Sequence, residues 1–168
     1  MNTEISALVS KLNLLPHPEG GWYKETYRAT ETIALESGSN AFPAGRNFST
    51  AIYFLLEGVN FSAFHRIKSD ELWHFYSGAP LHVYVILENG TLEIIKMGSD
   101  LEKGEVFQAT VKAGCWFASQ CADVSGFSLV GCTVSPGFDF QDFEMAKRVD
   151  LIEEYPTHAA VISALTRS

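Results

Sequence analysis

The sequence predicts an all-β protein, an antiparallel sandwich or jelly-roll barrel, with short helices near its two ends. From Phe48 to Val134, short apolar runs follow one another with turn residues between them and no helical spacing. Asn89-Gly90 between two such runs is a strong signal for a hairpin. Twelve Phe and six Tyr add to this prediction, because flat rings pack well on a pleated sheet.

The composition is that of a soluble globular protein, and the length suits one domain over residues 1–168. The net charge of −8, without a basic stripe, argues against a nucleic-acid partner and an anionic membrane surface. Residues 1–12 lack the pattern of a secretory signal, and no apolar run approaches the roughly 20 residues of a membrane span. Three cysteines without a Cys-x-x-Cys pair indicate reduced thiols, so we expect a cytoplasmic protein.

The first part of the chain is predicted to form a helix, a turn, a strand and a loop. Apolar residues recur at helical spacing over residues 3–12. Paired glycines then permit a turn at 16–21, and residues 22–30 alternate like a strand. Residues 35–47 are rich in Ser, Gly, Asn and Pro, which predicts a surface loop.

The central strands are short, as a barrel requires, and the pattern becomes helical after Pro136-Gly137. We predict strands at residues 48–56, 60–67, 71–77, 81–88, 91–96, 105–111, 115–118 and 126–134. We predict helical segments at residues 141–148, 150–154 and 158–165.

Strand alternation brings candidate catalytic groups to the inside of the barrel. His65 shares the apolar face of its strand with Ile67, so His65 should point inward. In the next strand, Glu71 falls on the same face as Trp73, while His74 falls on the opposite face. A buried carboxylate near an imidazole shifts the pKa of each group, and such a pair can act as a general base with an orienting partner.

In the catalytic hypothesis, His65 abstracts a proton, Glu71 orients His65, and Tyr23 or Tyr53 acts as the acid. In the alternative hypothesis, His65 is a core histidine that is hydrogen-bonded to Glu71 and does no chemistry. Further residues are candidates for ligand contacts, two through planar guanidinium groups and three through aromatic rings. They are Arg28, Arg46, Trp73, Phe75 and Phe117.

The chain contains several long motifs, in the order Pro16 to Tyr23, Glu25 to Arg28, Ser49 to Leu56, Phe64 to Tyr76 and Gly131 to Phe140. In this order they resemble the cupin family of unknown function called cupin-5, over residues 8 to 166. The resemblance implies a double-stranded β-helix, that is, a cupin jelly-roll barrel, and a homodimer. It does not imply an established reaction.

The resemblance also implies a ligand framework in which half of the metal ligands are replaced. The first cupin motif has two histidines and a glutamate between two glycines, and this chain keeps His65 and Glu71 at comparable spacing. Ile67 stands in place of the second histidine, and Phe117 stands in place of the third histidine, from the second cupin motif. Two protein ligands rarely hold a catalytic metal, so we expect no metal and no cofactor.

These residues leave three functions open, each with a small-molecule ligand in the barrel. The first is a metal-independent isomerase, epimerase or lyase that acts on a polar, sugar-like or carbonyl metabolite. The fold is similar to that of the rhamnose-pathway epimerases, which work without a metal, and this analogy supports the first function. The second is a non-catalytic metabolite-binding protein. The third is a divalent-metal enzyme in which His74 or His82 joins His65 and Glu71.

Overall fold

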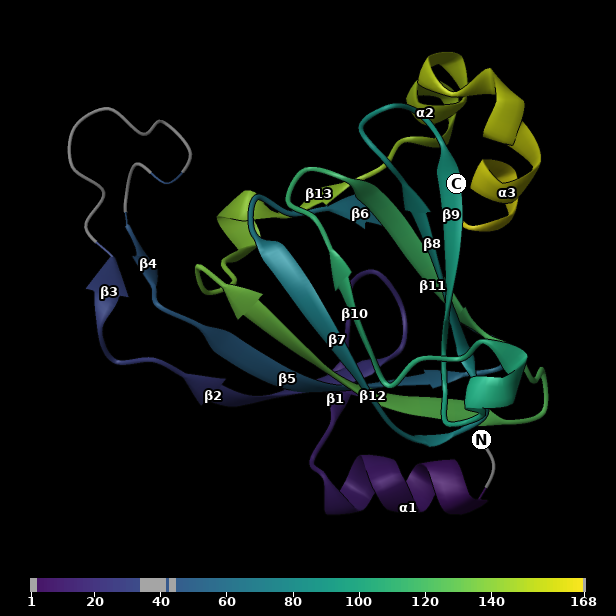
Figure 1. Ribbon diagram of the computed structural model, residues 1–168. Coiled ribbons are helices and arrows are strands. Elements are labelled where there is room, and N and C mark those ends of the chain that lie inside the picture. The colour runs from purple at the N-terminus through teal and green to yellow at the C-terminus, as the bar shows by residue number, and fades with distance from the viewer. Residues whose placement is uncertain (1–2, 34–41, 43–44, 168) are drawn as a thin grey trace.

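The computed structural model describes residues 3–33, 42 and 45–167, and it is a double-stranded β-helix of antiparallel strands (Figure 1). The first sheet contains, in spatial order, β1 (Leu15–Pro16), β2 (Trp22–Arg28), β5 (Thr50–Glu57), β12 (Phe127–Ser135), β7 (Asp70–Gly78) and β10 (Gln108–Val111). The second contains β13 (Glu144–Met145), β6 (Phe61–Arg66), β11 (Trp116–Cys121), β8 (Leu81–Ile86) and β9 (Leu92–Met97). A third, small sheet pairs β3 (Thr32–Ile33) with β4 (Arg46–Asn47).

The α-helices are short and lie near the two ends of the chain, as the sequence predicts. They are α1 (Thr3–Lys11), α2 (Arg148–Glu154) and α3 (Ala159–Ala164), with 3-10 helices η1 (Leu101–Lys103), η2 (Phe140–Asp142) and η3 (Pro156–His158). Figure 1 shows α1 on one side of the molecule and α2 with α3 on the other. Ile5 of α1 packs with Leu55 of the first sheet, whereas Ile162 of α3 packs with Trp116 of the second.

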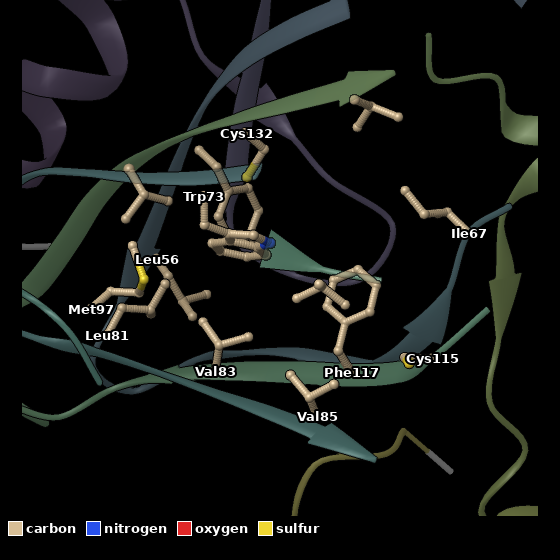
Figure 2. Packing of buried hydrophobic residues seen from close by; sticks show 14 residues of the cluster. Leu56, Ile67, Trp73, Leu81, Val83, Val85, Met97, Cys115, Phe117 and Cys132 are labelled. Atoms are coloured by element: carbon tan, nitrogen blue, oxygen red, sulfur yellow. The ribbon is translucent and has the colours of Figure 1, made fainter. Parts of the chain in front are cut away.

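The main hydrophobic core lies between the two large sheets (Figure 2). Strand alternation explains it, because every second side chain of each strand faces the opposite sheet. Trp73 and Cys132 enter the core from the first sheet, and Val83, Val85 and Phe117 enter from the second. The core fills one part of the space between the sheets and leaves a cavity in another part.

Most predicted strands are confirmed, and the Asn89-Gly90 hairpin joins β8 to β9 with Gly90 at a φ of 80°. The helix expected over residues 141–148 is wrong, because η2 ends at Asp142 and β13 then pairs with β6. Most of the loop predicted at 35–47 lies outside the described residues. The two-residue strands were not predicted, since two residues cannot display an alternating pattern.

Two predictions from composition concern the whole chain. In the described part of the chain, no helix is long and apolar enough to span a membrane. Cys115, Cys121 and Cys132 are free thiols, and all three are buried. They therefore act as small core side chains rather than as a disulfide framework.

Candidate functional site

The candidate site is a cavity of about 470 Å³ at one end of the space between the sheets. Strands β2, β5, β7 and β12 of the first sheet form most of its wall, and β6 of the second sheet contributes His65. The turn before β2 contributes His17 and Glu19, and the segment around η2 contributes Phe138, Phe140 and further aromatic rings. The cavity therefore combines apolar walls with a small group of ionisable side chains.

His65 is held by both ring nitrogens. Its side chain is buried, with Nδ1 2.7 Å from the carbonyl oxygen of Ala63 and Nε2 3.1 Å from Oε2 of Glu19. A carbonyl oxygen only accepts, so Nδ1 carries a hydrogen, and in the neutral ring Nε2 does not. The contact between Nε2 and Oε2 therefore contains one proton, carried by the imidazole or by the carboxyl group. Burial lowers the pKa of His65 to about 4, although the Ala63 hydrogen bond opposes this shift.

Glu19 is the carboxyl group on which the polar part of the cavity is centred. Its side chain is 8% exposed, and the hydroxyl of Ser62 donates to Oε1 at 2.8 Å. Nδ1 of His17 lies 3.4 Å from Oε2, so the same oxygen has His17 on one side and His65 on the other. Burial raises the pKa of Glu19, while His17, Ser62 and Arg167 oppose this effect.

Glu71 is a second buried carboxyl group in the same cavity. It points inward from β7, as strand alternation predicts, and the thiol of Cys132 is its hydrogen-bond partner. Burial, and then the nearby charge of Glu19, raise the pKa of Glu71 to about 8. Glu71 is therefore mostly protonated at neutral pH, and it can donate a hydrogen bond.

The structure corrects the expected pairing of His65 with Glu71. The carboxyl group within hydrogen-bonding distance of His65 is that of Glu19, which sequence reasoning did not select. Glu19 precedes His65 by many residues and belongs to a Pro- and Gly-rich turn, where no periodic pattern shows which way a side chain points. Its presence in the motif from Pro16 to Tyr23 is the one signal that could have identified it.

The two candidate tyrosines lie on opposite faces of the first sheet. Tyr23 lines the cavity and meets the ring of His17 edge-on, with 4.7 Å between ring centroids. Tyr53 points to the outer face, where it packs with the cluster beneath α1 and against Tyr76. Adjacent residues of a strand face opposite sides, and Phe54, which follows Tyr53, lines the cavity. Tyr53 therefore cannot act on a ligand in this cavity.

The two candidate arginines are both engaged by carboxylates. Arg28 lines the cavity, where Nε and Nη2 donate to the two carboxylate oxygens of Glu25 at 3.0 and 2.7 Å. Arg46 does not line the cavity, and its guanidinium donates to both oxygens of Asp142 at 2.6 and 2.8 Å. The expected ligand contact of Arg46 is therefore wrong, because this side chain ties β4 to η2.

The three candidate aromatic side chains also have different positions. Trp73 lines the cavity, whereas Phe117 lies behind His65, with 4.1 Å between their ring centroids. Phe75 packs against the main core and is not among the residues that line the cavity. Sequence reasoning missed Phe138, Phe140 and Phe143, because it assigned this segment to a turn and a helix.

The residues present do not fit the metal that the cupin framework implies. Ile67 lines the cavity where a second histidine would bind, and Phe117 is buried hydrocarbon in place of the third. Both nitrogens of His65 already have protein partners. His74 faces away from the cavity, where it contacts Thr133 and Gln108. Within the described residues, no group of three or more His, Cys, Asp or Glu side chains is arranged to hold a metal ion.

Two solved structures and one further protein sequence are similar to this chain. The structure of SO0799 from Shewanella oneidensis is similar, with 40% identity, 99% and 98% of the two chains covered and a TM-score of 0.85. A hypothetical protein from Leishmania major has 37% identity, covers 97% of this chain and 98% of its own, and has a TM-score of 0.88. The uncharacterized protein YML079W of Saccharomyces cerevisiae is 29% identical over 174 residues, which are 97% of this chain and 86% of that protein.

The family model described as Cupin superfamily (DUF985) matches residues 6–146, which is most of the chain. The relatives match over nearly the full length of both sequences, so the likeness is not limited to a shared barrel. Neither the family description nor the relatives' names state a reaction. The chain belongs to the Cupin_5 family of the cupin superfamily.

Proposed function

We propose that this cupin binds a small organic molecule in the cavity and catalyses metal-independent proton transfer beside a carbonyl group, as isomerases, epimerases and lyases do. The observation that carries the proposal is the 3.1 Å contact between Nε2 of His65 and Oε2 of Glu19 inside a cavity with aromatic walls. A buried pair that exchanges one proton can take a proton from a substrate and return it.

The proposed step needs no oxidant, reductant or metal. The pair of His65 and Glu19 first releases the proton of its contact to solvent. It then takes the proton from the carbon next to the carbonyl, and the electron pair of that C–H bond forms the enolate. Return of the proton to the opposite face gives an epimer, and return to the neighbouring carbon gives an isomer. Loss of a leaving group from the next carbon gives the lyase product. Tyr23 lines the same cavity and is our candidate for the acid that steadies the enolate.

Hydrogen exchange tests this proposal without knowledge of the natural substrate. The protein is incubated in D₂O with small ketones, keto acids and ketoses, and deuterium entry beside the carbonyl is followed by NMR. We expect exchange with at least one compound, and we expect His65→Asn and Glu19→Gln each to slow it by about 100-fold or more. Undiminished exchange in a folded His65→Asn variant would contradict the proposal.

A second candidate, a non-catalytic metabolite-binding protein, is favoured by one observation. Burial lowers the pKa of His65 to about 4, and a base with such a low pKa removes protons from carbon slowly. In this case, ligands bind in the cavity but leave it chemically unchanged. Compounds that bind and show no deuterium entry would support this second function over the first.

A further inference from the structure

The indole N–H of Trp73 is a buried donor that has no hydrogen-bond partner among the described residues. The side chain is 1% exposed and forms part of the cavity wall. Figure 2 shows its nitrogen on the side of the ring that faces Phe117 and Ile67, away from Leu56 and Met97. Trp73 and Ile67 both line the cavity. An unsatisfied buried donor is costly, and a ligand with an acceptor would relieve that cost.

The Trp73 ring is held in place by its neighbours. Phe54 meets it edge-to-face with 6.1 Å between ring centroids, and Phe117 does so at 6.2 Å. The strand that carries Trp73, β7, is hydrogen-bonded along both edges, to β12 and to β10. A ring clamped in this way cannot turn to find a protein acceptor elsewhere.

Glu71 provides a second donor on the same face of β7, two residues before Trp73. Both side chains line the cavity. Because burial raises the pKa of Glu71 to about 8, its carboxyl group carries a proton at neutral pH and can donate it in a hydrogen bond. Two donors on one wall favour a ligand oxygen with two lone pairs, such as a carbonyl oxygen.

The charges around the cavity disfavour an anionic ligand. Four carboxyl groups are among the described residues that line it: Glu19, Glu25, Glu71 and Asp139. Arg28 is the one Lys or Arg side chain in this lining, and the carboxylate of Glu25 already holds it with two hydrogen bonds. A carboxylate or phosphate would therefore lose its hydration in the cavity, beside several carboxyl groups and without a free guanidinium to compensate.

We infer that the cavity takes a neutral carbonyl compound, whose oxygen accepts hydrogen bonds from the indole N–H of Trp73 and the carboxyl group of Glu71. This inference rests on the proposed function in that both place the ligand in the same cavity, and it names the substrate class. Trp73 is then a specificity-determining residue, and carboxylates and phosphates are excluded as substrates of this cavity.

Four six-membered-ring probes test the inference. Cyclohexanone has the acceptor, and methylenecyclohexane replaces its oxygen by CH₂ with little change in shape. Cyclohexanecarboxylate and cyclohexylamine carry a negative and a positive charge. Titrations followed by protein NMR give a Kd for each probe. We expect cyclohexanone to bind roughly tenfold more tightly than the other three. Equal binding of cyclohexanone and methylenecyclohexane, or tighter binding of either charged probe, would overturn the inference.

Trp73→Phe removes the indole N–H and keeps an aromatic ring. We expect it to weaken the binding of cyclohexanone roughly tenfold and the binding of methylenecyclohexane much less. This difference separates a lost hydrogen bond from a packing defect, which would weaken the binding of both probes. Trp116→Phe is the matched control, because Trp116 is also buried with an unpartnered indole N–H but does not line the cavity. Glu71→Gln keeps a donor at this position and should retain cyclohexanone binding.

The outcomes separate this inference from the proposed function. If cyclohexanone binds through Trp73 but no compound exchanges deuterium, the catalytic proposal fails and the ligand class stands. If Trp73→Phe weakens both neutral probes equally, the inference fails, while the exchange experiment on His65 and Glu19 is unaffected. If Trp73→Phe does not fold, the comparison of the four probes on the unaltered protein still decides the inference.

Discussion

At the scale of single residues, Glu71 shows that the cavity disfavours an ionised side chain. Its carboxyl group is buried between apolar side chains, with the Cys132 thiol as its hydrogen-bond partner. The ionised form loses its hydration there, and the charge of Glu19 disfavours it further. Glu71 therefore keeps its proton at pH values well above the ordinary pKa of a glutamate, and the stability of the protein depends on pH as a result.

We expect Glu71→Gln to stabilise the protein relative to the unaltered protein, by an amount that grows as the pH rises. Below about pH 4.5 the folded and unfolded chains both hold the Glu71 proton, so its ionisation costs nothing. Between about 4.5 and about 8 the unfolded chain loses this proton and the folded chain keeps it, which lowers the free energy of unfolding with rising pH. The variant escapes this loss, which reaches a few kcal/mol near pH 8.

Urea unfolding at several pH values between 4.5 and 8.5 measures this difference. Glu93→Gln on the exposed side of β9 is the matched control for the removal of one carboxyl group. A gain from Glu71→Gln that is the same at both ends of the range would show that the group does not retain its proton in the folded protein.

Part of the candidate site could be predicted from the sequence. Alternation correctly places His65 and Glu71 inside, because each shares a face with the apolar residue two positions later, Ile67 and Trp73, which also lines the cavity. It could not find Glu19, since the orientation of a side chain in an irregular turn depends on contacts made after folding. The contact between Glu19 and His65 joins a turn to a strand of the other sheet, and no local pattern records it.

At the scale of elements, the turn before β2 sets the position of Glu19. Gly20 has a φ of 117°, which side-chain-bearing residues rarely adopt. The guanidinium of Arg167, after α3, donates to the carbonyl oxygen of Glu19 at 3.0 Å and to that of Phe61 at 3.0 Å. The C-terminal segment therefore fixes the turn against β6, which also carries His65.

Gly20→Ala should displace this turn. A Cβ at Gly20 would meet the carbonyl oxygen of Phe61 and the guanidinium of Arg167, in addition to the strain of a positive φ. We expect a loss of about 3 kcal/mol in the free energy of unfolding, together with weaker cyclohexanone binding. Gly104→Ala is the control, because its φ is 74° but nothing lies within 4 Å of its Cβ, so about 1 kcal/mol is expected. Similar losses for the two variants would contradict this role of the turn.

The elements also show why a sequence pattern can mislead locally. Strict alternation along residues 22–30 places Tyr27 on the same side as Tyr23, and Arg28 on the other side. A register shift between Glu25 and Tyr27 reverses this, so Arg28 lines the cavity while Tyr27 is exposed. A β-bulge inserts one residue without a reliable local signal, whereas the regular strands on either side could be predicted from their alternation.

At the scale of the whole molecule, the outer face of the first sheet carries exposed apolar side chains where α1 does not cover it. Tyr27, Tyr76 and Leu72 are 54%, 52% and 39% exposed. Tyr27 and Leu72 lie in one row across the sheet, linked through the pairs of Ala51 and Thr133. We propose that two copies of the chain pair through this face, in agreement with the homodimer that the family resemblance implies.

Sedimentation tests this pairing. We expect the unaltered protein to sediment as a dimer, and Tyr27→Lys with Leu72→Lys to give a monomer, because like charges would then meet across the paired faces. Val149→Lys on α2 is the control, since Val149 is 74% exposed on a different surface. A dimer that persists unchanged in the double variant would show that the copies pair elsewhere.

The central claim is that His65 shares a proton with Glu19 in a cavity made for an organic ligand. Nitrogen-15 NMR of the His65 imidazole, recorded from about pH 4 to 8 with and without zinc, tests it most directly. We predict a protonated Nδ1 throughout and no titration step until the pH approaches about 4. We also predict that one equivalent of zinc leaves both ring nitrogens unchanged. A midpoint near the ordinary value of 6.5, or a zinc-dependent shift of Nε2, would contradict the claim.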